Sequence, residues 1–457
     1  MSRVIFGWAF GAVFFQLSAG AVYAAFARQL GATEAVFGFL SGVYQLMGWV
    51  QIPAARLLEG SVGARAMMLT AGLICRLMWV LAAMLPLLNR VFPEVVTRSA
   101  MLPMFIGCLV LSSIGQAFTG PSFFAWMSAL VPDRVGPTFW ARRHQVGTVV
   151  AIFAVLIGGG IADRAGLIKE WSNGEITPLL TYSLLLTVAA LCGVMDIAAF
   201  IGVKEPPSAG PKIKQPPFLA SMRIPLRERA VRNYLIFTIF GMMGFASTGP
   251  LLWLFCLEHL EFDKTQTGFL LTICPLLGVA CSAKWWGGIA KIHGTRPMVR
   301  FASVGLIIVP LCWLFALPES KVGLAIMLFG SGILVTAYEI SNLNFMTRAC
   351  PHLARPTLVA LFSICAGMTF ALTSWGCGIA AEQLSFWHME IAGIEFANFH
   401  LIFAFSLLPR TINALFLAPR LEDNSASSTR EAMSEVGASL AAAFGPRFTR
   451  YFEAREE

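Results

Sequence analysis

The sequence has few charged residues. Asp, Glu, Lys and Arg make up 13% of its 457 residues, whereas soluble globular domains contain about 25%. Hydrophobic residues make up 57% of the sequence, and its mean hydropathy is +0.71. These values exclude a soluble globular protein, because a chain with so many apolar residues must expose most of its surface to an apolar phase.

The sequence also lacks the motifs of metal sites and of catalysis. Its ten cysteines lie almost all in apolar segments without a CxxC pair, and its six histidines form neither HExxH nor a paired set. Such isolated cysteines are typical of small buried side chains. Neither a nucleophile triad nor paired carboxylates are present. We therefore expect no metal, no cofactor and no enzymatic activity.

Long apolar runs dominate what is present. A membrane-spanning helix needs roughly 20 apolar residues, and unbroken runs favour helices over barrel strands, which alternate. The sequence predicts an all-α polytopic membrane protein with twelve transmembrane helices. The runs cover residues 5–27, 35–56, 66–88, 102–129, 146–167, 178–202, 233–257, 266–289, 299–317, 323–346, 357–381 and 397–418.

The basic residues are distributed unevenly between alternate loops. If the N-terminus is cytoplasmic, the inward loops hold eighteen Lys and Arg residues and the outward loops hold seven. The seven are Arg28, Arg90, Arg98, Arg164, Lys169, Lys264 and Lys321. Positive loops remain on the cytoplasmic side, so both termini are predicted to be cytoplasmic and the protein to lie in the cell inner membrane. The net charge of +8 is explained by this topology, and we expect no nucleic-acid partner.

Two sets of residues recur in the second half of the sequence. MSALVPDRVGPTFWA, at residues 127–141, returns as MTRACPHLARPTLVA at residues 346–360. Gly38-Phe39-Leu40 returns as Gly268-Phe269-Leu270. Prolines end a helix because they cannot donate a hydrogen bond, so residues 127–141 and 346–360 are predicted hinges between spans. Repeated halves are a recurring construction among transporters.

The repeat and the loop composition predict four parts. Residues 1–203 and 233–418 are the two six-helix bundles, and residues 204–232, rich in proline and lysine, are a cytoplasmic linker. Residues 419–457 are a cytoplasmic tail.

Two glycine-arginine turns indicate a family. LLEGSVGARAM (57–67) and WGGIAKIHGTRPM (286–298) resemble the loop motif of the major facilitator superfamily. The resemblance covers residues 4–418 and implies two pseudo-symmetric bundles around a central path lined by the first, fourth, seventh and tenth spans. It also implies gating contacts at the loops, for which the candidates are Glu59, Arg65, Arg142, Arg143 and Arg296. For the arginines at 142 and 143, anchoring to lipid headgroups is an equal alternative.

Polar residues in the spans along that path are the candidate solute contacts. They are Gln16, Tyr23, Gln45, Ser112, Gln116, Tyr338, Glu339 and Asn342, with Ser247 and Thr248 beside a predicted helix break at Pro250. The alternative is that such residues hold helices together, at about 0.6 kcal/mol each.

Three charges lie inside spans, where each costs at least about 2.5 kcal/mol. Glu339 is the preferred functional residue, binding a cationic or hydroxylated solute or taking up a proton; its alternative is an ion pair with Arg348. Arg76 is predicted to be a packed or snorkelling arginine. Asp196 is predicted to pair with an interfacial base. Near span ends, interface anchors are expected at Trp49, Trp79, Trp126, Trp140 and Trp387.

Two functions are compatible with these features. The first is a secondary active or facilitative transporter that moves a small organic solute, such as a sugar, nucleoside, metabolite or drug, by alternating access. A small-molecule solute, a proton and the lipid bilayer are then the partners, and we expect a monomer. The second is a transporter-like membrane sensor or scaffold that moves nothing, suggested by the divergent loop motif and the tail.

Overall fold

The computed structural model describes residues 2–59, 63–132, 135–204, 225–348, 355–391 and 394–421, which are almost entirely helical. Among these residues, eleven helices are long and apolar enough to cross a membrane, and one bent helix pair makes a twelfth span. The predicted all-α polytopic fold is therefore confirmed.

The helices follow the apolar runs closely. The first six spans are built from α1 (Ser2–Leu17), α2 (Ala21–Gln29), α3 (Glu34–Leu46), η1 (Met47–Val50), α4 (Gln51–Glu59), α5 (Ala64–Val91), α6 (Arg98–Leu130), α7 (Gly136–Asp163), α8 (Ala165–Trp171) and α9 (Pro178–Ala198). The later spans comprise η2 (Pro225–Arg227), α11 (Arg229–Leu254), η3 (Phe255–His259), α12 (Lys264–Gly268), η4 (Phe269–Ile273), α13 (Cys274–His293), α14 (Arg296–Gly305), α15 (Ile308–Leu314), α16 (Lys321–Arg348), α17 (Arg355–Gln383), α18 (Asn398–Ile412), η5 (Asn413–Leu417) and η6 (Ala418–Arg420).

Both repeated hinges lie where a helix ends. The first separates α6 from α7, and the second separates α16 from α17. At the glycine-arginine turns, α5 begins directly after Gly63 and α14 begins two residues after Gly294. Gly294 has φ +75°, a left-handed conformation that a side chain would strain. The repeated proline and glycine motifs of the sequence therefore lie where one helix ends and the next begins.

The first span is broken, which the sequence did not predict. Helices α1 and α2 are bent by 48° across residues 18–20. The predicted break at Pro250 is wrong, because α11 continues through this proline and changes to a π-helix only at Phe255. A proline removes one backbone hydrogen bond, which a long packed helix tolerates at the cost of a local kink.

Contacts group the chain into two compact units. The first unit comprises residues 1–215, 246–273 and 367–399, and the second comprises residues 216–245, 274–366 and 400–457. Helix α11 starts at Arg229, inside the predicted linker, and both α11 and α17 contribute to each unit. Residues 205–224 of the linker and 422–457 of the tail lie outside the described part of the chain.

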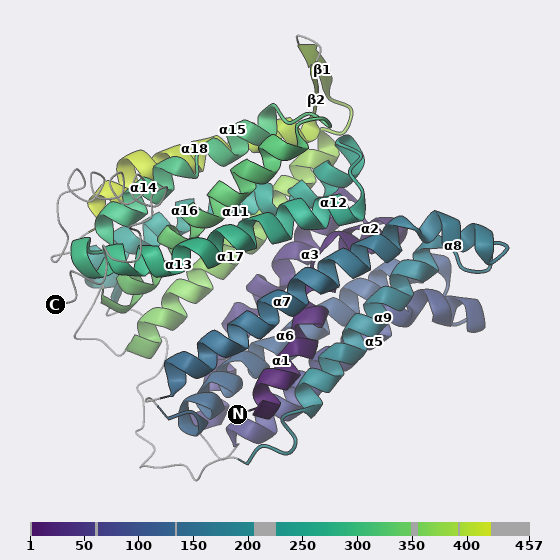
Figure 1. Ribbon diagram of the computed structural model, residues 1–457, viewed down its shortest axis with the longest axis horizontal. Coiled ribbons are helices and arrows are strands. Elements are labelled where there is room, and N and C mark those ends of the chain that lie inside the picture. The colour runs from purple at the N-terminus through teal and green to yellow at the C-terminus, as the bar shows by residue number, and fades with distance from the viewer. Residues whose placement is uncertain are drawn as a thin grey trace, which may run out of the picture. The chain divides into compact units, whose positions relative to one another are not determined.

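The first unit packs α1, α5, α6, α7 and α9 against one another. Helix α1 lies against α7 and α9, and α5 lies against α6 and α9 (Figure 1). Trp126 and Met127 at the end of α6 are 1% and 0% exposed and pack with Phe200. The predicted interface anchoring of Trp126 is therefore wrong, because its ring is part of the core.

The second unit is centred on α16. Helices α13 and α14 pack against it, and its Tyr338 belongs to an aromatic core with Tyr234, Phe237 and Trp286. Trp286 donates from Nε1 to the Ile333 carbonyl at 2.9 Å. This bond satisfies the indole N–H inside an apolar core.

A short hairpin joins α17 to α18. Strands β1 (His388–Ile391) and β2 (Ile394–Ala397) pair antiparallel, with His388 opposite Ala397 (Figure 1). The sequence had not predicted these strands. The hairpin leaves the all-helical character of the spans unchanged.

Candidate functional site

A cavity of about 460 Å³ lies within the first unit. Its walls come from α1, α2, α3, α5, α6, α11 and α17. Small-molecule sites in proteins span about 300–1,000 Å³ and combine apolar walls with a few polar groups. The cavity matches this description in both size and lining.

Four of the predicted solute contacts meet at this cavity. Tyr23, Gln45, Ser112 and Gln116 all line it. Cys75 joins the last two, because its Sγ lies 3.2 Å from the Ser112 hydroxyl and 3.5 Å from Gln116 Oε1. The Oε1 atom of Gln45 is buried and accepts no hydrogen bond. One acceptor of a residue that lines the cavity is therefore unsatisfied.

Aromatic rings form the apolar part of the wall. Trp79 lies edge-on to Phe14, with ring centroids 5.7 Å apart, and to Tyr23 at 5.9 Å. Trp253 of α11 and Phe370 of α17 complete this lining. Trp79 had been predicted as an interface anchor; this is wrong, because its ring is turned toward the cavity.

Arg76 also lines the cavity, and it is a packed arginine, as predicted. Its side chain is only 3% exposed, and its guanidinium carbon lies 3.9 Å from the Phe14 ring centroid. One of its nitrogens lies 3.8 Å from Oδ2 of Asp196 in α9. Asp196 thus pairs with this arginine inside the unit rather than with a base at the interface.

Glycines of α1 make room for that carboxylate. A Cβ on Gly11 would lie 2.7 Å from Asp196 Oδ2, and one on Gly7 would lie 3.2 Å from the Asp196 carbonyl. Arg143 of α7 interacts electrostatically with the same carboxylate. Its guanidinium carbon lies 3.9 Å from the Trp8 ring centroid. The acid is therefore placed against α1 between two arginines.

Gln16 lies outside this cavity. It lines a separate space of about 10 Å³ together with Gly20 and Trp253. Gln16 and Tyr23 had been predicted to share one helical face, but that spacing requires a continuous helix. The bend after Leu17 separates the two residues, so only Tyr23 lines the cavity.

The remaining solute candidates belong to the second unit. Tyr338 is 4% exposed and stacks on Phe237 with centroids 5.6 Å apart. Asn342 accepts a hydrogen bond from the Tyr234 hydroxyl, both at its backbone carbonyl, 2.8 Å away, and at its side-chain oxygen. Glu339, next to Tyr338, is exposed. Tyr338 therefore contributes to the core of its unit, while Glu339 does not.

Three of the predicted gating residues make contacts within their own units. Arg65 donates to the Ile201 carbonyl at 2.6 Å, and Arg296 donates to the Pro419 carbonyl at 3.0 Å. Arg142 is exposed, and Arg143 packs on Trp8. The side chain of Glu59 lies outside the described part of the structure. Their role as gates stays a prediction.

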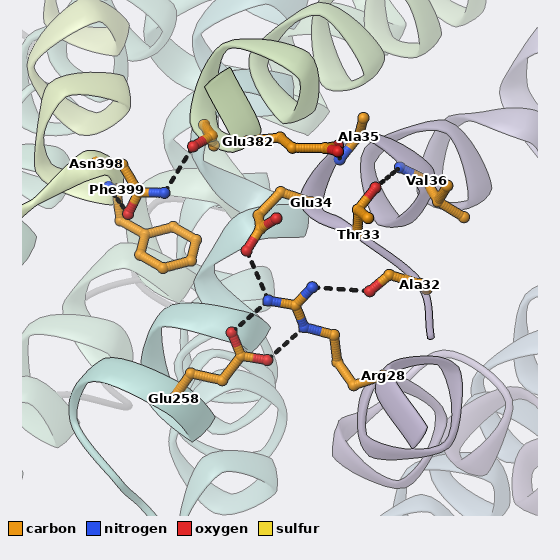
Figure 2. A network of polar contacts seen from close by, with 11 residues as sticks. Arg28, Ala32, Thr33, Glu34, Ala35, Val36, Glu258, Glu382, Asn398 and Phe399 are labelled. Atoms are coloured by element: carbon orange, nitrogen blue, oxygen red, sulfur yellow. Dashed lines mark hydrogen bonds and ion pairs between the residues drawn. The ribbon is translucent and has the colours of Figure 1, made fainter. Parts of the chain in front are cut away.

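An ion-pair network that the sequence did not predict joins α2, α3 and η3 of the first unit. Arg28 donates to Glu258 from Nε at 2.5 Å and from Nη2 at 2.6 Å, and to Glu34 at 2.6 Å (Figure 2). Its Nη1 donates to the Ala32 carbonyl at 2.7 Å. We call Arg28, Glu34 and Glu258 the clasp. Figure 2 shows how the guanidinium lies between the two carboxylates.

Two further contacts join early and late helices of the first unit. Asp163, the last residue of α7, accepts from the backbone N–H groups of Lys264 and Thr265 at 2.7 and 3.1 Å. Ser374 of α17 donates to the Gly38 carbonyl at 2.7 Å. Each bond ties an early helix to a segment over a hundred residues later, where sequence spacing carries no signal.

The sequence comparisons decide the family. Residues 4–374 match the sequence profile of the Major Facilitator Superfamily. The chain belongs to this superfamily. Its members are membrane transporters of solutes, and the protein is a multi-pass membrane protein. Comparison with curated protein sequences gave no match.

Solved structures with the superfamily fold resemble this member. The nucleoside transporter NupG aligns with TM-score 0.65 and 12% identity over 92% of this chain and 99% of its own. A bacterial homologue of the human lysosomal transporter Spinster, in an inward-facing and unoccupied conformation, gives 0.64 and 15% over 93% and 97%. The D-xylose-proton symporter gives 0.62 and 12% over 91% and 97%. At these identities the likeness concerns the fold.

Proposed function

We propose that the protein transports a small organic solute across the membrane by alternating access, and that the first-unit cavity binds this solute. The cavity is the observation that supports the proposal. It combines polar groups of Gln45, Ser112 and Gln116 with aromatic walls inside a chain that spans the membrane. Polar groups within a span are costly unless they serve a ligand or a partner helix.

The remaining predictions complete the proposal. Gln16, Tyr338, Glu339 and Asn342 are further solute or proton contacts, and Glu59, Arg65, Arg142, Arg143 and Arg296 are gating residues. The protein lies in the cell inner membrane as a monomer with both termini cytoplasmic and acts as a transporter, without a catalytic role. Residues 1–203 and 233–418 move as two bundles joined by the linker, and residues 419–457 form a cytoplasmic tail.

Uptake into proteoliposomes tests the proposal. The full chain is reconstituted and offered radiolabelled sugars, nucleosides, organic acids and amines, with empty liposomes as the blank. We expect uptake of one class, reduced at least about tenfold by Gln116→Ala because a polar contact in the cavity is lost. Gln29→Ala, at an exposed position at the end of α2, is the matched control and should transport normally.

Two outcomes separate the alternatives. Uptake that Gln116→Ala and Trp79→Ala leave unchanged shows that the solute site lies elsewhere. If the panel gives no uptake, while deletion of residues 421–457 changes a cellular response, the protein is a sensor or scaffold. Glu339→Gln tests the proton: altered pH dependence of uptake with unchanged folding supports proton coupling, and an unchanged pH profile excludes this residue.

A further inference from the structure

The buried charges beside the cavity do not balance. Asp196 is 6% exposed and interacts with both Arg76 and Arg143. Two guanidinium groups thus share one carboxylate, and this set keeps an excess positive charge. Arg143 is only half-buried and does not line the cavity, so the positive group that an entering anion meets is the buried Arg76.

Arg76 has hydrogen-bonding capacity left. Its Nη2 lies 3.8 Å from the Asp196 carboxylate, longer than a hydrogen bond, and its Nη1 contacts Cys75 Sγ at 3.8 Å. Its Nε is buried without a partner. A guanidinium binds a carboxylate best with two parallel N–H groups. The guanidinium of Arg76 therefore has N–H groups that do not bind Asp196 and that can bind a ligand.

The lining carries no second charge. Among the described residues that line the cavity, Arg76 is the only charged one, and the remainder are aromatic, aliphatic or neutral polar side chains. Phe14 and Phe15 lie 3.9 and 4.9 Å from its guanidinium carbon, so the charge is held between rings. Arg76 would repel a cationic solute, and among the described lining residues no carboxylate offsets this repulsion.

The other lining residues indicate what chemical groups the ligand carries besides its charge. Trp79, Tyr23 and Phe37 present rings that accommodate a planar group by edge or face contacts. The unpartnered Oε1 of Gln45 accepts one hydrogen bond. The matching solute carries an aromatic ring, an anionic group and a hydroxyl or N–H donor.

We propose that the first-unit cavity selects a small aromatic monocarboxylate, whose carboxylate is bound by Arg76 and whose ring packs against Trp79. This inference rests on the proposed transport function and names the substrate class of the same site. Arg76 is then the residue that determines specificity, in addition to its packing against Phe14.

Three ligands with one ring test the charge. Titration calorimetry of the full chain in nanodiscs compares 4-hydroxyphenylacetate, its neutral amide and the cationic tyramine. We expect the acid to bind at least about tenfold tighter than the amide, and tyramine to bind more weakly still. Equal binding of acid and amide, tighter binding of tyramine, or no binding of any of the three overturns the proposal.

Variants assign the effect to Arg76. Arg76→Gln combined with Asp196→Asn removes both members of this pair and leaves Arg143, which does not line the cavity, in place. We expect about 10- to 100-fold weaker binding of the acid with little change for the amide. Arg90→Gln removes a charge from the same helix outside the cavity and is the control. Unchanged acid binding in a folded double variant overturns the proposal.

If the double variant does not fold, Arg76→Lys keeps the charge but loses the bidentate geometry. This variant should then weaken binding of the acid more than binding of the amide, and an equal effect on both would contradict the proposal.

The transport function is tested separately. Uptake of a neutral or cationic solute without binding of the acid overturns the substrate class and leaves transport standing, whereas the absence of uptake for every solute contradicts transport itself.

Discussion

Arg28 binds the carboxylate of Glu258 with two nitrogens, although the two residues are 230 positions apart. The same guanidinium binds Glu34, so one cation holds two acids from different helices. All three side chains are partly exposed, with 25%, 15% and 36% of Arg28, Glu34 and Glu258 accessible. The clasp thus connects the ends of α2 and α3 to the end of the seventh span, at a position that water reaches.

Breaking the clasp should change access more than stability. Exposed ion pairs contribute about 0–1 kcal/mol, so Glu258→Gln is expected to lower the free energy of unfolding by less than about 1 kcal/mol. Loss of the contact between spans should let a membrane-impermeant maleimide reach Cys75, which lines the cavity. Mass spectrometry of the Cys75 peptide measures the labelling. Glu261→Gln, in the same exposed segment, is the control; equal labelling in both variants would exclude a gating role for the clasp.

Asp163 should stabilise α12 from a distance. Its carboxylate accepts from two N–H groups of the first turn and from the Thr265 hydroxyl at 2.5 Å. A lost N-terminal cap costs about 1–2 kcal/mol, and Asp163→Ala should reduce the free energy of unfolding in micelles by this amount. Asp263 occupies the N-cap position itself but makes no side-chain cap bond. Asp263→Ala should therefore cost clearly less, and a reversed order would contradict the assignment.

The close approach of α3 and α17 predicts an asymmetric response to alanine. A Cβ on Gly42 would lie 2.7 Å from the Ala371 Cα, and backbone atoms cannot yield cheaply. Overpacking costs about 1–3 kcal/mol, so Gly42→Ala should lower the apparent melting temperature. Gly376→Ala in α17 is the control, because a methyl group added there would have nothing within 4 Å. Equal melting temperatures would show that the helices separate without cost.

The two tryptophans expected at the interface should respond differently. Trp126 is buried in the core of the first unit, and its replacement by alanine should cost about 3–5 kcal/mol. Trp79 lines the cavity, so Trp79→Ala should chiefly reduce solute affinity. Melting temperature and ligand binding, measured on both variants, separate the two roles. A Trp79→Ala variant with normal affinity would remove this ring from the site.

The sequence predicts the spans and their reversals well because the bilayer imposes length and hydropathy. Each hinge of the repeat, at residues 127–141 and 346–360, lies between long helices as predicted. Rotation of a helix about its axis is less determined. Helix α5 is apolar on most sides, so its pattern did not reveal that Arg76 and Trp79 share the cavity wall.

The sequence pattern also did not predict the contacts between residues that are far apart in the chain. Glu258, which binds Arg28, and Lys264, which binds Asp163, lie about a hundred or more residues from their partners, and such pairings leave no periodic signal. The bend of the first span was likewise missed, since Ser18, Ala19 and Gly20 are compatible with a continuous helix. Four of eight predicted solute contacts still reached the cavity, because polar residues in spans are rare enough to be informative.

The interruption between α1 and α2 has an electrostatic consequence. A helix leaves its first N–H groups without acceptors, and this end carries about half a positive elementary charge. In the first span such an end begins at Ala21, and the flanking Ser18, Ala19 and Tyr23 line the cavity. This potential belongs to the backbone, so no exchange of side chains abolishes it. The C-terminal carbonyl groups of α1 lie at the same break and carry the opposite partial charge, so the break places both kinds of backbone group beside the cavity.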